Sequence, residues 1–174
     1  MDKLSITWFG HATFLLRTPG GKRLLFDPWF TSNPSCPDAM RKPPKADLIL
    51  ASHGHFDHIE DLLLSARESG APVVGIFELC DWLGRKGIQN TSPMNKGGSQ
   101  TIAGLRVTMT DARHSSGFFD DGHMVYMGEP AGYVLTLEDG RAIYFAGDTC
   151  LFGDMRLIGE EGLDLAVLPI GDNY

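Results

Sequence analysis

The predicted fold is decided by one stretch, Asp47-Leu-Ile-Leu-Ala-Ser-His53-Gly-His55-Phe-Asp57-His58. Its short apolar run, bounded by polar residues, is typical of a buried strand. The residues that follow, 59–66, place apolar side chains at helical spacing. The cluster between His53 and His58 is therefore expected on a strand-to-helix loop, where α/β proteins commonly carry a functional site.

The residue types in this cluster favour metal binding. Neutral imidazole is a common zinc ligand, and a carboxylate oxygen is a compatible partner. His53 and His55 alternate, so in an extended segment they project to the same side and can share one ion. Asp57 and His58 follow the bend and can hold a second ion, since two metals about 3.5–4 Å apart are a known hydrolytic arrangement. A lone histidine would be read as an ordinary loop residue, but four candidate ligands in six residues predict a metal site.

The spacing His53-x-His55-x-Asp57-His58 resembles the signature of the metallo-β-lactamase superfamily. Four further segments agree with that resemblance: Trp8-Phe-Gly-His11-Ala-Thr13, Leu25-Phe-Asp27-Pro-Trp29, His114 after a predicted strand, and Ala146-Gly-Asp148-Thr149. In this order they are similar to the branch of metal-dependent hydrolases related to L-ascorbate-6-phosphate lactonase, over nearly the whole chain. The resemblance implies an α/β fold, an αββα sandwich of two mixed β-sheets packed face to face with helices outside.

The resemblance also implies a set of metal ligands. They are His53, His55, Asp57, His58, His114 and Asp148. Asp148 would bridge both metals, a role that suits the two oxygens of a carboxylate, although a turn-capping aspartate is the alternative. By itself His114 would be an ordinary loop histidine, but it follows a predicted strand as the first cluster does. Asp57 is the predicted catalytic residue, because it is also placed to orient the attacking water.

Two further residues have open roles. His11 lies at a predicted bend beside Gly10, where it is either a turn residue satisfied by the backbone or a residue that supports the ligands or contacts substrate. Asp27 ends a predicted strand before Pro28. It either orients a ligand histidine through a carboxylate–imidazole hydrogen bond or caps the following turn, and the cap is slightly favoured.

The rest of the chain is predicted to alternate strands and helices, which implies some parallel strand pairing. Strands are expected at 4–8, 12–17, 23–26, 47–51, 72–77, 101–103, 105–112, 131–137, 141–145 and 163–170. Helices are expected from Ile59 to Gly70, from Glu78 to Lys86 and at 151–161, whereas 31–45 reads as a surface loop and 90–98 is polar and glycine-rich. Residues 118–128 are either a substrate-facing flap or a hydrophobic connection under the sheet, and His123 within them is not predicted to be a ligand.

Length and composition bound the function. The 174 residues suit a single domain, 1–174, and a hydrophobic content of 43% is typical of globular proteins. A net charge of −7 argues against non-specific nucleic-acid binding, and no apolar stretch approaches the roughly 20 residues that span a bilayer. Three scattered cysteines, Cys36, Cys80 and Cys150, suggest free thiols in a reducing, cytoplasmic compartment.

The sequence predicts a hydrolase that uses metal-activated water on an ester or lactone of a small molecule. The alternatives are a phosphodiesterase of the same fold and a non-catalytic metal-binding module. Zinc is the expected ion, one or two per chain, and manganese or iron would also suit an oxygen-rich site. The family continues beyond the position of Tyr174 and supplies a last histidine there. The domain is therefore expected to lack its C-terminal strands and helices, with apolar surface that would favour a homo-oligomer.

Overall fold

The apolar run after Asp47 forms strand β4 (Leu48–Leu50), all of whose residues are buried. The protein is described by a computed structural model over residues 3–160 and 162–171, so the predicted chain end at 172–174 and the last residue of the predicted helix at 151–161 lie outside the described residues. Strand β4 lies within a six-stranded sheet of order β1-β2-β3-β4-β5-β6. The other strands are β1 (Ser5–Trp8), β2 (Phe14–Arg17), β3 (Arg23–Phe26), β5 (Val73–Ile76) and β6 (Thr91–Met94).

The first sheet is mixed, as predicted. β1, β2 and β3 pair antiparallel, whereas β3, β4, β5 and β6 pair parallel. Strand β6 was missed by the sequence analysis, because its residues are polar and include Pro93. A proline lacks the N–H that an interior strand must donate, and it is tolerated here because β6 forms the edge of the sheet.

A five-stranded sheet follows in the second half of the chain, in the order β13-β12-β11-β8-β7. Its strands are β7 (Ser99–Ile102), β8 (Leu105–Asp111), β11 (Ala131–Thr136), β12 (Ala142–Phe145) and β13 (Leu165–Val167). Along β8, Leu105, Val107 and Met109 are buried while Arg106 is exposed, which is the two-residue period of a strand with one buried face. Only β12 and β13 pair parallel, so this sheet is mixed as well.

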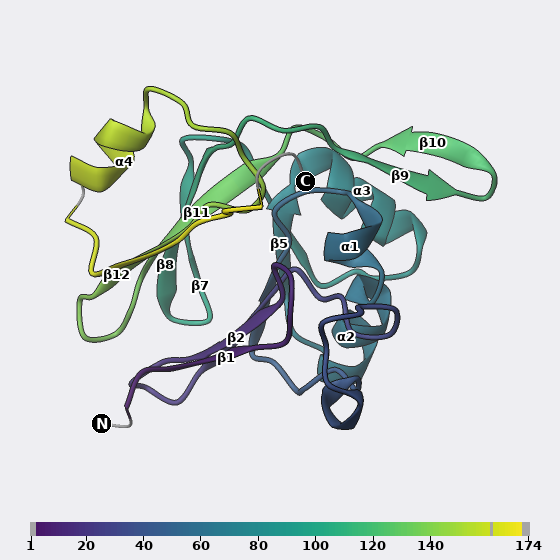
Figure 1. The fold of residues 1–174 in the computed structure, drawn as a ribbon, viewed down its shortest axis with the longest axis horizontal. Helices are drawn as coiled ribbons and strands as arrows, with labels where there is room; N and C mark the ends of the chain where they lie inside the picture. The colour runs from purple at the N-terminus through teal and green to yellow at the C-terminus, as the bar shows by residue number, and fades with distance from the viewer. Residues whose placement is uncertain (1–2, 161, 172–174) are drawn as a thin grey trace.

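The two sheets pack face to face, and helices cover their outer sides (Figure 1). Between the sheets, the rings of Phe26 on β3 and Phe145 on β12 lie 4.7 Å apart. Helices α1 (Phe56–Ile59), α2 (Leu62–Ser69) and α3 (Phe77–Arg85) lie on the first sheet's side, and α4 (Met155–Glu160) lies on the second sheet's side. This is the αββα arrangement that the sequence predicted.

The prediction of one helix beginning at Ile59 was wrong at its start. The chain turns helical at Phe56, so Asp57 and His58 lie on α1 and not on a loop. The helix is then interrupted before Leu62 because the carboxylate of Asp61 accepts backbone hydrogen bonds from the loop after β3, including Phe30 N at 2.6 Å. This tertiary contact is invisible in the apolar spacing. Similarly, α4 begins at Met155 instead of residue 151, and the short 3₁₀ helix η1 (Asp38–Met40) interrupts the predicted surface loop.

A separate hairpin of β9 (Gly117–Asp120) and β10 (His123–Tyr126) extends from the body of the molecule (Figure 1). The carboxylate of Asp120 accepts hydrogen bonds from Trp82 Nε1 at 2.8 Å and Lys86 Nζ at 2.9 Å, which fixes the hairpin on α3. Phe119 and Met124 are largely exposed, whereas Phe118 and Val125 pack against the core, so only one face of the segment matches the predicted hydrophobic connection. Among the described helices, none has the length and apolarity to cross a bilayer.

Candidate metal centre

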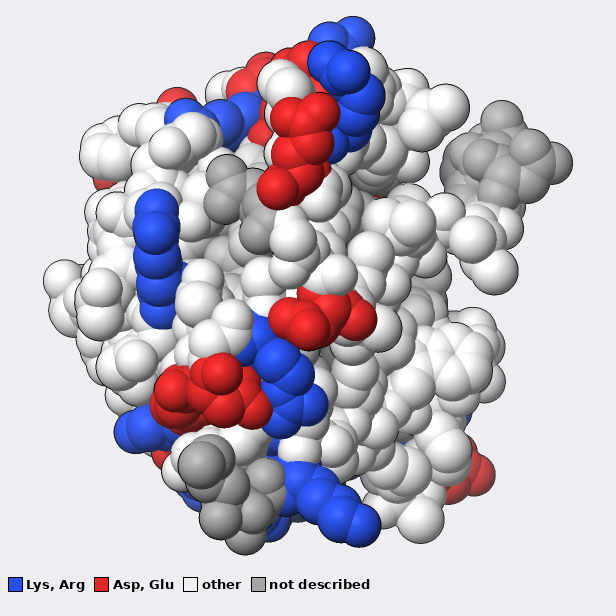
Figure 2. Space-filling view, turned by 90° about the vertical axis from the view of Figure 1, so that its left-hand side faces the viewer, with Lys and Arg blue, Asp and Glu red and all other residues white. Residues whose placement is uncertain are grey.

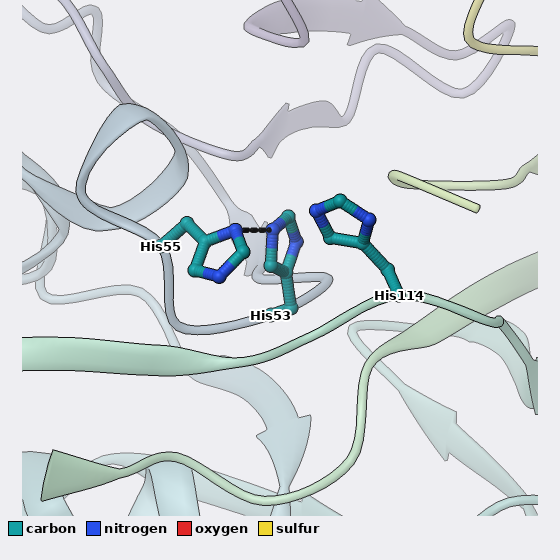
Figure 3. Close-up of side chains that lie close together, drawn as sticks. All are labelled: His53, His55 and His114. Carbon is teal, nitrogen blue, oxygen red and sulfur yellow. Dashed lines mark hydrogen bonds between the residues drawn. The ribbon is translucent and has the colours of Figure 1, made fainter. Parts of the chain in front are cut away.

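Three histidine rings converge where the two sheets meet (Figure 3). His53 and His55 follow β4 of the first sheet, and His114 follows β8 of the second. His53 Nε2 lies 3.0 Å from His55 Nδ1, and the ring of His114 lies 5.1 Å from that of His53 and 5.0 Å from that of His55. Residues 61 positions apart are thus brought together by the sandwich, and their nitrogens could hold one cation.

A buried carboxylate fixes the proton positions of two histidines in the cluster. Asp27 Oδ2 accepts a hydrogen bond from His58 Nδ1 at 2.7 Å and from the Ser52 hydroxyl at 2.6 Å. Because the single hydroxyl proton of Ser52 goes to Asp27, Ser52 Oγ must accept the proton on His53 Nδ1, 3.0 Å away. Both rings are therefore protonated on Nδ1, which leaves Nε2 of each free for a cation.

The carboxylate of Asp27 thus contacts His58 directly and His53 through Ser52. It also accepts the backbone N–H of Ser52 at 2.7 Å, and it is fully buried. Its backbone lies in the left-handed region, with φ of 43°, which is uncommon for a residue other than glycine. Of its two predicted roles, the contacts are those of a residue that orients histidine. Ser52 was given no role by the sequence analysis, although its position directly before His53 was a signal.

A second group of side chains lies beside the first. His11 Nε2 is 3.1 Å from Asp57 Oδ2 and 3.1 Å from His58 Nε2. Asp148 Oδ2 lies 3.3 Å from His58 Nε2 and 3.8 Å from His114 Nε2, so this carboxylate faces both groups. His11, Asp57 and His58 could hold a cation, as could His53, His58 and Asp148.

Burial and neighbouring charge set the protonation of the group without a cation. Burial, together with the charge of the surrounding imidazoles, holds the pKa of His53 well below its usual 6.5, and burial also lowers the pKa of His55. Burial disfavours the charged form of His58 too, but the carboxylates of Asp27 and Asp148 outweigh it and raise the pKa of His58 to about 10.

The carboxylates of Asp57 and Asp148 are ionised at neutral pH. Burial raises the pKa of Asp57, but the hydrogen bond from His11 and the charge of His58 outweigh this and hold it below 3.8. Burial likewise raises the pKa of Asp148, and the hydrogen bond and charge of His58 again lower it. Ionised carboxylates are the state that a divalent cation requires of such ligands, as are the neutral imidazoles of His53 and His55, whereas His58 must release its Nε2 proton when a cation binds.

The loop between His53 and His55 is held in place by two serines that directly precede strand β9. The backbone N–H of Gly54 donates to Ser116 Oγ at 3.1 Å, and Ser115 Oγ lies 3.2 Å from His55 Nε2. A Cβ at Gly54 would overlap the Cβ and Cγ of Met127, so only glycine fits between His53 and His55. Neither serine was singled out by the sequence analysis.

Gly147 forms the backbone turn that positions the carboxylate of Asp148. Its φ is 62°, and a Cβ there would lie 2.6 Å from Ser52 Cβ. The left-handed turn after β12 and the close approach to the β4 loop both need glycine. The chain consequently brings Asp148 of the second sheet against the histidines of the first.

A cavity of about 550 Å³ opens beside the cluster. His11, His114 and Asp148 line it on the polar side, and apolar walls come from the residues Trp8, Phe14, Phe145 and Val167, among others. Arg113 is the one lysine or arginine in its lining as far as the structure describes the chain. The β9–β10 hairpin contributes none of the described lining residues, so its predicted position as a flap over substrate has no support in this cavity.

The donor set fits a divalent metal. Zinc–nitrogen bonds of about 2.0–2.1 Å place two ligands of a tetrahedral ion roughly 3.3 Å apart, close to the 3.0 Å between His53 Nε2 and His55 Nδ1. The structure brings together every residue that the sequence predicted as a ligand: His53, His55, Asp57, His58, His114 and Asp148. His11 and Asp27 lie in direct contact with them.

Known proteins with a similar sequence are described as metal-dependent hydrolases. The family described as "Beta-lactamase superfamily domain" matches residues 22–173. A "UPF0173 metal-dependent hydrolase" of Solibacter usitatus is 51% identical over 172 residues, which make up 98% of this chain and 74% of that protein. A protein of Rubrobacter xylanophilus with the same description is 50% identical over 169 residues, 96% of this chain and 70% of that protein.

Among solved structures, the chain is similar to Igni18, described as a novel metallo hydrolase from the archaeon Ignicoccus hospitalis. The TM-score is 0.83 with 36% sequence identity, and the match covers 98% of this chain and 72% of Igni18.

Proposed function

This chain belongs to the metallo-β-lactamase superfamily and is a metal-dependent hydrolase, and on that premise we propose that it cleaves a carboxylic ester or lactone of a small molecule. The observation that carries the choice of bond is the cavity beside the metal centre, whose walls are largely apolar. Such walls accommodate an uncharged substrate more readily than an anionic one. The resemblance to the lactonase branch supports the same choice.

We assign the two groups of side chains to two cations. His53, His55 and His114 would hold the first, Asp57 and His58 would contribute to the second, and Asp148, which faces both groups, would bridge them. Zinc suits a site built mainly from imidazole nitrogen, while manganese or iron would suit the more oxygen-rich second group. A bound divalent cation would supply water that ionises near neutrality, because it lowers the pKa of that water to about 7.

Side chains of the protein orient the attacking water and fix the proton positions of the ligand histidines. Asp57 stays ionised at neutral pH and is partly buried, so its carboxylate can accept a hydrogen bond from the attacking water and fix its direction. Asp27 and Ser52 keep the ligand histidines in one tautomer throughout. The apolar walls of the cavity exclude bulk water from the acyl group of the substrate.

A phosphodiester is the competing substrate, and the charge of the cavity argues against it. Recognition of an anionic diester commonly uses several cationic donors, whereas Arg113 is the one described lysine or arginine of the lining. Its guanidinium also stacks on Phe152 at 5.8 Å and faces Asp111 at 3.8 Å, so its charge is partly engaged. On the face shown in Figure 2, acidic and basic side chains are intermixed, which agrees with a small-molecule partner in place of nucleic acid.

The test is a hydrolysis screen of the purified chain, stripped of metal and then loaded with zinc, manganese or iron. Lactones, aryl esters, thioesters and bis-aryl phosphodiesters are compared by kcat/KM. We expect lactones or esters to exceed phosphodiesters, and Asp57→Asn to lower turnover by about 100-fold or more, as loss of a proton acceptor does. His123→Asn, on the exposed hairpin, is the matched control. Faster cleavage of the phosphodiester would overturn the assignment of the bond.

A further inference from the structure

The turn between β1 and β2 holds His11 in a strained conformation against the metal centre. His11 has a φ of 51°, in the left-handed region that is unfavourable for a residue with a side chain. Hydrogen bonds fix the backbone on both sides: Trp8 Nε1 donates to His11 O at 2.8 Å, and Thr13 N donates to Gly10 O at 3.1 Å. Strain that the surroundings maintain in this way is found chiefly at functional sites.

The ring of His11 is aimed at two other donor atoms. The His11 ring packs between the rings of Trp29 and His58. The centroid of the His11 ring lies 5.4 Å from that of Trp29 and 4.9 Å from that of His58. This places His11 Nε2 3.1 Å from both His58 Nε2 and Asp57 Oδ2. His58 uses its other nitrogen, Nδ1, to donate to Asp27, so the nitrogen that faces His11 is the one left free for a cation.

A hydrogen bond alone does not account for all these contacts. His11 Nε2 can donate its proton to Asp57, and a proton on His58 Nε2 can go to Asp148 Oδ2 at 3.3 Å, but the 3.1 Å approach of the two Nε2 atoms is then left without a hydrogen bond. A cation among the three atoms would satisfy all of them. With metal–nitrogen bonds of about 2.0–2.1 Å, neighbouring ligands lie roughly 2.9 Å apart around an octahedral ion and 3.3 Å around a tetrahedral one, and the observed 3.1 Å falls between these values.

We propose that His11 Nε2 is itself a ligand of the second cation, together with Asp57 and His58. The β1–β2 turn then supplies an imidazole to this site, where the sequence analysis gave His11 only a supporting or substrate-binding role. This proposal rests on the metal centre proposed above, and it goes further by assigning a ligand 42 residues before the first residue of the histidine cluster.

The experiment follows metal binding and not turnover. Metal-free protein labelled with ¹⁵N-histidine is titrated with zinc, and the ring nitrogens are followed by NMR. A coordinated Nε2 loses its proton and shifts, whereas a hydrogen-bond donor keeps its proton. His11→Asn identifies the His11 signals by their loss, and asparagine tolerates the left-handed backbone at this position, so the variant is expected to fold. His123→Asn is the control for removal of a histidine.

In the wild-type chain, we expect two equivalents of zinc to bind and His11 Nε2 to lose its proton with the second. In His11→Asn, we expect the first equivalent to bind as before, at His53, His55 and His114, and the affinity for the second to fall by about tenfold or more. A His11 that keeps its Nε2 proton in the loaded chain, or a variant that binds both equivalents unchanged, would overturn the ligand assignment alone. Failure of the wild-type chain to bind any cation would overturn this proposal and the metal centre together.

Discussion

His58 donates from Nδ1 to Asp27 Oδ2 at 2.7 Å, although 31 residues separate them along the chain and both side chains are fully buried. Asp27 reaches a second histidine, His53, through the hydroxyl of Ser52. A single carboxylate at the end of β3 therefore controls the ring orientation of one histidine in each group of candidate ligands.

Asp27→Asn is expected to weaken binding of both cations. The amide keeps the shape of the carboxylate and tolerates the left-handed backbone, but its charge is lost and the two histidines lose their shared acceptor. Residues behind metal ligands typically contribute about 10- to 100-fold in affinity. Ser52→Ala breaks only the link to His53, so it should weaken the first cation more than the second. Competition with a chromophoric zinc chelator measures the affinity for each of the two cations in both variants.

Asp47→Asn is the matched control for that prediction, since Asp47 is also a hydrogen-bonded carboxylate but lies at the start of β4 against Arg23. Zinc affinity should be unchanged in this variant. Equal losses in the Asp47 and Asp27 variants would show that a general change in net charge, and not the orientation of histidine, accounts for the effect.

Removal of metal is expected to lower the melting temperature. A ligand that binds only the folded state at about 100 times its Kd adds about 2.7 kcal/mol to the free energy of unfolding, which shifts Tm by roughly 5–10 °C for a chain of this length. Scanning calorimetry of chelator-treated protein before and after addition of zinc checks this. His114→Ala, which removes one nitrogen of the first group, should shrink the shift, and an undiminished shift would place the cation elsewhere.

Gly54→Ala and Gly84→Ala should change stability in opposite directions. At Gly54, the new methyl group overlaps Met127, and overpacking of this kind costs about 1–3 kcal/mol. Gly84 lies in α3 with no atom near the position of a Cβ, so alanine there should stabilise the helix by about 0.5–1 kcal/mol. Urea unfolding compares the two. Loss of zinc affinity in Gly54→Ala but not in Gly84→Ala would tie the Gly54 contact to the histidine loop.

The three cysteines should differ sharply in reactivity. Burial raises the pKa of the Cys80 thiol to about 12 and also raises the pKa of Cys36, so at pH 8 both remain thiols and not the reactive thiolates. Cys150 is exposed beside the cavity. A disulfide reagent at pH 8 should therefore modify one residue rapidly, and Cys150→Ser should abolish that fast phase.

Much of the fold could be predicted because local patterns determine it. The apolar residues of β4 and the two-residue period of β8 each specify their own element. The misplaced start of α1 and the missed strand β6 have tertiary causes. Asp61 interrupts the helix by bonding to a loop 30 residues earlier, and the polar residues of β6 form a strand because β5 lies beside them. Neither cause leaves a local pattern.

The candidate site also combines features that local sequence patterns predict with features that depend on tertiary contacts. His53, His55, Asp57 and His58 are close in the sequence, so their spacing indicates their chemistry directly. The contact of His11 with His58 and the path from Asp27 through Ser52 to His53 depend on where β1, β3 and β4 lie in the sheet. Such contacts become visible only after the chain has folded.

The position of the histidine rings between the two sheets has a consequence for the molecule as a whole. His53 and His55 follow a strand of one sheet, and His114 and Asp148 follow strands of the other, so an ion held by these residues would link the two halves of the sandwich. Ion retention and inter-sheet cohesion are then thermodynamically linked. A substitution that loosens the Phe26–Phe145 contact should accelerate ion release from a site that it does not touch.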